Sequence, residues 1–524
     1  MSNKPVIFGC TAIVVVVVGS FVLLVTNLQY RTHRRLERMS DSVMRANRPK
    51  PLATGQNFPD PAPREIMTMA STLVDRGNAE QRAIGLIATQ PGDETDRIIR
   101  DLQANRGNTP SDAWRLKIME GDNWYHASQP EKAVQPYEQA MALMTDDTTA
   151  RNDAALVHIL TRAGNVAEHR RRAIEIAEGT LKLTPAGSAE WAIVQNELGL
   201  AWSDNPAGIP NENLTKAIAA FESSLTVDTK DGSPVQWAIT QSKLGLAYSD
   251  DALTGDRDGH LRKGIAAYDA AMTVYTRYAF PTSWAWMENN LGIASMKLST
   301  GDRAQNVTRA IAAYEGALTV YTQAYPVNWA GTQIALGVAW SNLPTGNRDE
   351  NFHKAIAAYE KALTVDTKGA FPENWAWTKN ALGFAWSHVT TGDQDENLNN
   401  ALAAHKDALT VYAKGNHPQQ KLETLVDISW CQLLMRDFAG TIATAKECAA
   451  SPADLDLEVN SAHALLFLGR VDEATTIYKK HVGEKAGNRV WENIVREDFH
   501  EMETHGLTHP GFQRIREMLG LASP

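Results

Sequence analysis

Histidines gather near the C-terminus with a spacing that invites a metal-site hypothesis. His500 is followed by glutamate, and His505 and His509 lie just downstream. The H-E-x-x-H pattern of zinc enzymes places two histidines four residues apart on one helix face. His500 and His505 are five residues apart, and Gly506 and Pro510 interrupt any helix between His505 and His509. We therefore interpret this stretch as a capped helix end and expect no metal.

Acidic loops form a second candidate for ion binding. The segment from Asp393 to Asn397 reads Asp-Gln-Asp-Glu-Asn. It lacks the internal glycine and the distal bidentate glutamate of a calcium loop. Asp, Glu and Asn directly before a helix are the residues that cap its N-terminus. We expect helix capping here rather than calcium binding.

The remaining chemistry-bearing residue types show no catalytic pattern. The sequence has no glycine-rich loop ending in Gly-Lys-Ser/Thr, no G-x-S-x-G, and no arrangement typical of a Cys-His or Ser-His-Asp site. Its three cysteines, Cys10, Cys431 and Cys448, cannot form a disulfide framework. Cys431 and Cys448 fall on neighbouring predicted helices, where small buried side chains fit. We expect a protein that is not an enzyme and that has no cofactor.

The sequence contains an internal repeat with a period of 45 to 47 residues, in the range typical of solenoids and related arrays. Each copy begins with Trp-Ala, at Trp191, Trp237, Trp284, Trp329 and Trp375. Leu-Gly follows at a fixed distance, at Leu198-Gly199, Leu244-Gly245, Leu291-Gly292, Leu336-Gly337 and Leu382-Gly383. A proline precedes each following copy, at Pro234, Pro281, Pro326, Pro372 and Pro418.

The apolar spacing predicts two helices in each copy, joined by a polar loop. Trp191, Val194, Leu198 and Trp202 share one face of the first helix. The second helix carries four apolar positions spaced four, three and four residues apart, as in Val307, Ile311, Tyr314 and Leu318. Because one such hairpin cannot bury its apolar face alone, the copies are expected to stack.

These residues resemble the tetratricopeptide repeat (TPR) family. Leu-Gly is followed three residues later by an aromatic residue (Trp202, Tyr248, Trp340, Trp386), then by alanine, then by a ring four residues further on. Three features depart from the family pattern: the period exceeds 34 residues, Trp-Ala lies upstream of the usual motif, and Ser295 replaces one aromatic residue. The resemblance is strong over 191–414 and weaker over 64–185 and 419–480. It implies an all-α, right-handed α-solenoid.

The resemblance also implies candidate binding residues on the concave side of the first helices. In the family these positions line a groove that holds extended peptides. They fall here on Asn196, Asn289 and Asn380, flanked by Trp286 and Trp377. Packing between helices is the alternative interpretation for all five residues. The lysines and arginine that clamp acidic C-terminal peptides in chaperone-binding members have no evident counterparts.

An apolar, uncharged stretch from Val6 to Leu28 is long enough to cross a bilayer as a helix. We expect a retained transmembrane anchor rather than a cleaved signal, since no small-x-small cleavage site follows the stretch. Arginines follow directly, at Arg31, Arg34, Arg35 and Arg38. The positive-inside rule therefore places the body in the cytoplasm, with a periplasmic body as the alternative.

Composition divides the chain further. The first 50 residues carry eight basic and two acidic side chains, so the total net charge of −10 leaves −16 for the remainder. An acidic body argues against nucleic-acid binding. We divide the chain into an anchor (1–30), a basic then proline-rich linker (31–63), degenerate hairpins (64–190), five repeats (191–415), two further hairpins (416–486) and a helical cap (487–524).

Together these observations predict a membrane-anchored scaffold or adaptor that binds partner proteins, such as other subunits of a membrane-associated complex. Residues 6–28 are expected to lie in the bilayer. A periplasmic envelope-assembly factor is one alternative. A small-ligand or carbohydrate binder, with Trp286 and Trp377 as stacking platforms, is another.

Overall fold

A computed structural model describes residues 83, 86–87, 90–105, 110–127, 129–144, 147–161, 164–415, 417–447, 455–486 and 489–521. Within these ranges, no helix combines the length and the apolar character needed to cross a membrane. The predicted anchor at 6–28 and the linker at 31–63 lie outside the described residues. The described chain divides at 287/288 into two compact units, one on each side of this point. Each unit is treated by itself below.

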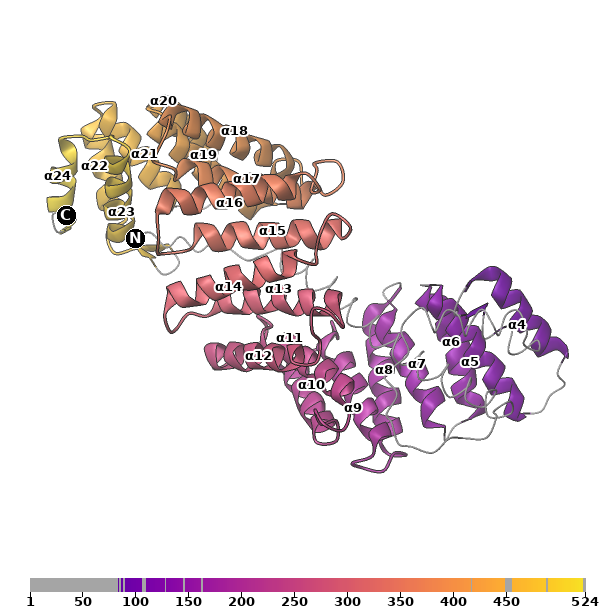
Figure 1. The fold of residues 1–524 in the computed structure, drawn as a ribbon. Helices are drawn as coiled ribbons and strands as arrows, with labels where there is room; N and C mark the ends of the chain where they lie inside the picture. Colours follow the sequence, from indigo (N-terminus) through magenta and orange to yellow (C-terminus); the bar gives the residue numbers. More distant parts are fainter. Residues whose placement is uncertain are drawn as a thin grey trace. The chain divides into compact units, whose positions relative to one another are not determined.

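Helical hairpins form the repeats, as the periodicity predicted (Figure 1). Each hairpin has a first helix that starts close to its Trp-Ala and a second helix of about the same length. The pairs are α9 (Ala189–Ser203) with α10 (Pro210–Leu225), α11 (Pro234–Tyr248) with α12 (Arg257–Met272), α13 (Pro281–Lys297) with α14 (Arg303–Leu318), α15 (Pro326–Ser341) with α16 (Arg348–Leu363), and α17 (Pro372–Ser387) with α18 (Gln394–Tyr412).

Further helices flank the repeats. Before them lie α4 (Asp93–Asn105), α5 (Pro110–His126), α6 (Pro130–Leu143), α7 (Thr148–Leu160) and α8 (Val166–Leu181). After them lie α19 (Pro418–Leu434), α20 (Phe438–Glu447), α21 (Leu455–Phe467), α22 (Val471–Lys480), α23 (Trp491–Thr504) and α24 (Gly511–Met518). A two-stranded antiparallel hairpin, β1 (Lys485–Ala486) and β2 (Arg489–Val490), separates α22 from α23 and was not expected.

Stacking follows one rule in both units. Within a unit, a second helix packs on the first helix of its own hairpin and on that of the next, as α10 does on α9 and α11 and as α16 does on α15 and α17. First helices also contact one another across hairpins, α9 with α11 before residue 287, and α15 with α17 and α17 with α19 after it. The prediction of a solenoid of TPR-like hairpins is thereby confirmed for the described residues. In each unit these first helices form a row on which candidate binding residues lie.

The Leu-Gly motif has a clear packing reason. A Cβ added at Gly337 would lie 2.5 Å from the Tyr359 ring, because this ring of α16 lies directly against the α15 backbone. The same contact recurs in every repeat, for Gly199 with Phe221, Gly245 with Tyr268, Gly292 with Tyr314 and Gly383 with His405. Glycine at this position therefore leaves room for a ring of the second helix against the backbone of the first.

The upstream Trp-Ala closes the open end of each hairpin. Trp329 packs in a cluster with Ala362, in the last turn of α16, and with Val365, just beyond the end of that helix. Trp375 packs in the same way with Tyr412 and neighbouring residues of α18. A tryptophan in the first turn of one helix thus covers the last turn of its partner, which extends the apolar interface beyond the usual motif.

Ordered loops between the two helices explain the long period. Each loop contains a glycine with φ between 81° and 107°, a range that suits glycine because it has no Cβ. The next residue caps the second helix in four copies, as Asp393 does by accepting a hydrogen bond from the Glu396 N–H. Asn397 then donates to the Val389 and Thr391 carbonyls, which fixes the loop from inside.

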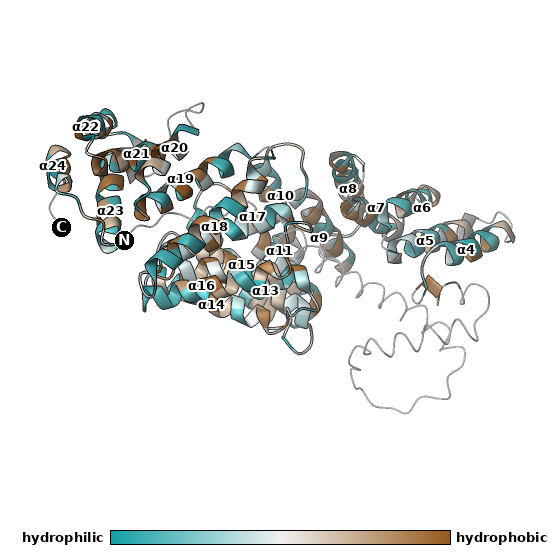
Figure 2. Cartoon of the chain, turned by 90° about the horizontal axis from the view of Figure 1, so that it is seen from above, coloured by the Kyte–Doolittle hydropathy of each residue, from teal (hydrophilic) through white to brown (hydrophobic). Residues whose placement is uncertain are grey.

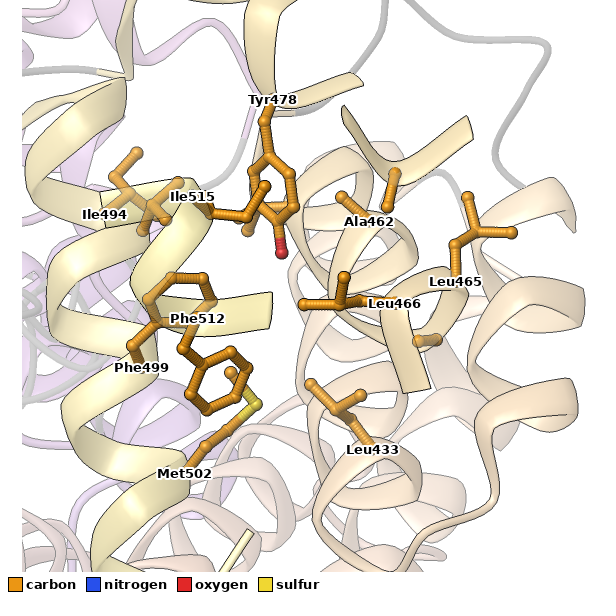
Figure 3. Close-up of a cluster of buried hydrophobic side chains, with 14 of the residues drawn as sticks. Leu433, Ala462, Leu465, Leu466, Tyr478, Ile494, Phe499, Met502, Phe512 and Ile515 are labelled. Atoms are coloured by element: carbon orange, nitrogen blue, oxygen red, sulfur yellow. The ribbon is translucent and has the colours of Figure 1, made fainter. Parts of the chain in front are cut away.

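Amphipathic helices also build the C-terminal end of the chain. Brown and teal faces alternate along α22, α23 and α24 in Figure 2. Their apolar side chains meet those of α19 and α21 in one core (Figure 3). Phe499 and Phe512 stack with ring centroids 4.1 Å apart. The same core includes Trp491, Ile515 and Leu519 from the region 487–524, where the sequence predicts a helical cap.

Candidate functional site

The five groove candidates differ sharply in exposure. Asn196 is 4% exposed, and Trp286 and Asn289 are each 1% exposed. Trp377 and Asn380 are half-buried. Ligand contact by these five residues stays a prediction, but only Trp377 and Asn380 are accessible to a ligand without rearrangement.

Before residue 287, the buried candidates bind their own protein. The Asn196 side chain donates to the Thr240 hydroxyl and accepts from the Lys243 ammonium, both on the next first helix. The Lys243 ammonium also lies 6.0 Å from the centroid of the Phe221 ring. Trp286 packs edge-to-face on Tyr268 with centroids 6.0 Å apart. These contacts give Asn196 and Trp286 a packing role, the alternative interpretation from the sequence.

After residue 287, Asn289 follows the same rule. Its Oδ1 accepts a hydrogen bond of 3.1 Å from the Thr332 hydroxyl on α15. Its Nδ2 has no hydrogen-bond partner among the described residues. Because the side chain is 1% exposed and bonds to α15, this amide contributes to packing between the two first helices.

Asn380 makes the equivalent contact but stays accessible. Its Nδ2 donates to Asp427 Oδ2 on α19 at 3.0 Å, and its Oδ1 accepts from His405 Nδ1 on α18 at 2.7 Å. His405 occupies the ring position against Gly383. Burial lowers the pKa of His405, and the Asp427 carboxylate 3.9 Å away only partly offsets this effect. A neutral imidazole therefore donates to the asparagine, which in turn holds the carboxylate.

The resulting α17–α19 patch consists of Trp377, Asn380 and Asp427. The Asp427 side chain retains 23% exposure, and one of its oxygens is anchored by Asn380. Trp377 lies one helical turn before Asn380 and is half-buried among α15–α18 side chains. A carboxylate fixed on α19 can hold a cationic group through charge, and an indole on α17 can hold one through its ring face. Sequence analysis found Trp377 and Asn380 but missed Asp427, which lies outside the five copies.

The ion-site predictions can be compared directly with the structure. Helix α23 ends at Thr504 and His505 caps it, so the expected helix end is confirmed. Asp393 caps α18, as expected for the acidic loops. Among the described residues, no group of three or more His, Cys, Asp or Glu side chains is arranged to hold a metal ion. Cys431 is buried, as expected, and Cys448 lies outside the described residues.

One buried network has the residue types of a proton relay. Tyr478 Oη lies 2.6 Å from His463 Nδ1, and His463 Nε2 lies 3.3 Å from Asp498. His463 and Tyr478 are both fully buried within the C-terminal core. With these rings buried in that core, the network joins α21, α22 and α23 and fixes their packing.

Comparisons with known proteins show a likeness of fold. Neither a protein-family model nor a curated protein matches the chain. A solved structure of human IFIT1, as a dimer with PPP-AAAA, is 14% identical with a TM-score of 0.41, over 80% of this chain and 84% of that one. A tetratricopeptide repeat protein from Parabacteroides merdae is 14% identical with a TM-score of 0.36, over 60% and 98%. The yeast Sti1 TPR2AB domain in complex with pHSP90 is 16% identical with a TM-score of 0.20, over 61% and 98%. The assignment of TPR-like hairpins rests on the repeated packing contacts described above.

Proposed function

We propose that the chain is a scaffold that binds a partner protein through the α17–α19 patch, and that residues 6–28 hold it in a membrane. The observation that carries the proposal is the Asp427 carboxylate, which Asn380 fixes in place while 23% of its side chain stays exposed. Successive first helices hold these three residues on a rigid row, so little conformational entropy is lost on binding.

The partner segment is proposed to be basic. A lysine or arginine side chain satisfies Asp427 by a charge-assisted hydrogen bond and packs its aliphatic stem on Trp377. The net charge of −16 outside the first 50 residues also favours encounter with a cationic partner. The carbohydrate alternative relied on paired tryptophan platforms, and Trp286 is buried.

Charge reversal tests the proposal. In Asp427→Lys, lysine enters a position that Lys243 already occupies in the earlier repeat, beside an equivalent asparagine, so the stack is expected to tolerate it. The matched control is Glu360→Lys, an equal charge change at an exposed position on α16. Full-length variants are extracted in detergent and co-purifying proteins are quantified by mass spectrometry.

We expect Asp427→Lys to deplete at least one co-purifying protein about tenfold or more, the scale of a lost buried charge pair, while Glu360→Lys retains it. Equal recovery with both variants contradicts the proposal. Membrane orientation is tested separately: with a cytoplasmic body, protease added to intact spheroplasts leaves residues beyond the anchor uncut. Cleavage there supports the periplasmic alternative.

A further inference from the structure

Four charged or titratable side chains from three helices converge near the C-terminus of the chain. Glu501 on α23 lies at the centre. Its Oε1 is 3.6 Å from Arg348 Nη2 at the start of α16, 3.9 Å from His388 Nε2 at the C-cap of α17, and 3.8 Å from His505 Nε2 at the C-cap of α23. These contacts connect the C-terminal end of the chain to a repeat more than a hundred residues earlier.

The tautomer of His388 is set by its own helix. His388 Nδ1 lies 2.8 Å from the Phe384 carbonyl, which can only accept, so Nδ1 carries the proton. Neutral His388 therefore presents an unprotonated Nε2 to the Glu501 carboxylate, and two acceptors face each other. Protonation turns Nε2 into a donor and this contact into an attraction.

His505 adds a second titratable group on the other side of the carboxylate. Its side chain is 2% exposed, and neither ring nitrogen has a hydrogen-bond partner among the described residues. A buried polar ring without a partner is costly, and a proton on Nε2 would direct it to Glu501. Arg348 is half-exposed and permanently charged, so it supplies an attraction that does not vary with pH.

Glu501 itself does not titrate in the range where histidines do. Burial alone would raise the pKa of Glu501, but His505, His388 and Arg348 outweigh burial and lower it to about 2. The carboxylate is therefore ionised from about pH 3 upward in the folded protein. Histidine ionises near pH 6.5 in model peptides. Any change in these contacts between pH 5 and 8 thus comes from His388 and His505.

We propose that Glu501 and His388 form a pH-sensitive latch that holds helix α23 against the C-terminal end of α17, tight in mildly acidic solution and weakened above neutral pH. In the acidic state imidazolium groups at His388 and His505 join Arg348 around one carboxylate. Above neutral pH Arg348 still attracts the carboxylate from α16, but neutral His388 turns an unprotonated Nε2 toward it. His505 lies on α23 itself, so its contact with Glu501 stays within that helix in either state. The latch is independent of the proposed partner binding at Trp377, Asn380 and Asp427.

Distances between spin labels test the latch in the full-length protein. Labels are placed at two exposed positions, Glu350 on α16 and Arg496 on α23, with the native cysteines replaced. Double electron–electron resonance is recorded between pH 5.5 and 8. We expect one narrow distance at low pH and a broadened, longer distribution at high pH, with the docked-to-undocked ratio changing about tenfold or more across this range.

Variants separate the latch from general pH effects. Glu501→Gln removes the charge and is expected to abolish the pH dependence, leaving a broad distribution throughout. Glu503→Gln is the matched control, because Glu503 lies two residues away and pairs with Arg516 instead. Should Glu501→Gln not fold, His388→Lys supplies a permanent charge and is expected to shift the distribution toward the docked state at pH 8. A constant distance in the wild type, or an unchanged pH dependence in Glu501→Gln or His388→Lys, overturns the proposal.

Discussion

Replacing Gly337 by alanine tests the packing rule of the whole array. The new Cβ would lie 2.5 Å from Tyr359 Cε1 and 2.8 Å from Cδ1, so either the ring or the α15 backbone must move. Tyr359 is 2% exposed in a close-packed cluster, which limits its room to adjust. Overpacking of this kind costs about 1–3 kcal/mol. Alanine recovers about 1 kcal/mol of helix propensity over glycine. We expect a net destabilisation of up to about 2 kcal/mol.

Native-state hydrogen exchange of α15 and α16 measures this local stability without assuming that the long array unfolds in one step. Gly369→Ala, in the loop that follows this hairpin, is the control, because an added Cβ there meets nothing within 4 Å. In a Tyr359→Ala background the clash is absent, so Gly337→Ala should become neutral or slightly stabilising. A double-mutant cycle with no coupling between the two sites would refute the ring-on-glycine account.

Three further predictions concern buried polar groups. Burial raises the pKa of Asp366 to about 6, with an Asn374 hydrogen bond opposing it, so wild-type stability should fall as pH rises from about 4 to about 6. In urea titrations, Asp366→Asn should remove this pH dependence and raise the free energy of unfolding at pH 7 by about 1–2 kcal/mol. The pKa shift taken in full would correspond to roughly 3 kcal/mol, but partial exposure to solvent reduces it. Asp204→Asn should cost about 2–3 kcal/mol by calorimetry, since it takes the carboxylate from fully buried Arg170. Asn397→Ala should cost about 1–2 kcal/mol and speed hydrogen exchange in the loop it fixes; unchanged exchange would contradict its role.

Local patterns in the sequence predicted much of this fold. Apolar spacing predicted two helices joined by a polar loop in each repeat, and the structure has them in that order. The capping role of Asp393 followed from its position directly before a helix. These features depend on residues within one or two turns of each other, where periodicity and capping preferences are informative.

Contacts between repeats could not be predicted in the same way. The pairing of Gly337 with the Tyr359 ring requires the register of two helices, which one sequence does not specify. Asn380 was a candidate from the sequence, but its partner Asp427 lies in a hairpin outside the regular copies. The cluster around Glu501 joins segments more than a hundred residues apart. The membrane anchor remains a prediction, because residues 6–28 lie outside the described chain.

The most direct test of the proposed binding surface is a photo-crosslink from position 377. A photoreactive amino acid replaces Trp377 in the full-length protein, crosslinks form in living cells, and tandem mass spectrometry identifies the partner peptide attached. The account predicts a peptide with a lysine or arginine within a few residues of the crosslink, and loss of that adduct in Asp427→Lys. An adduct on a segment without basic residues, or one that persists after charge reversal, would contradict it.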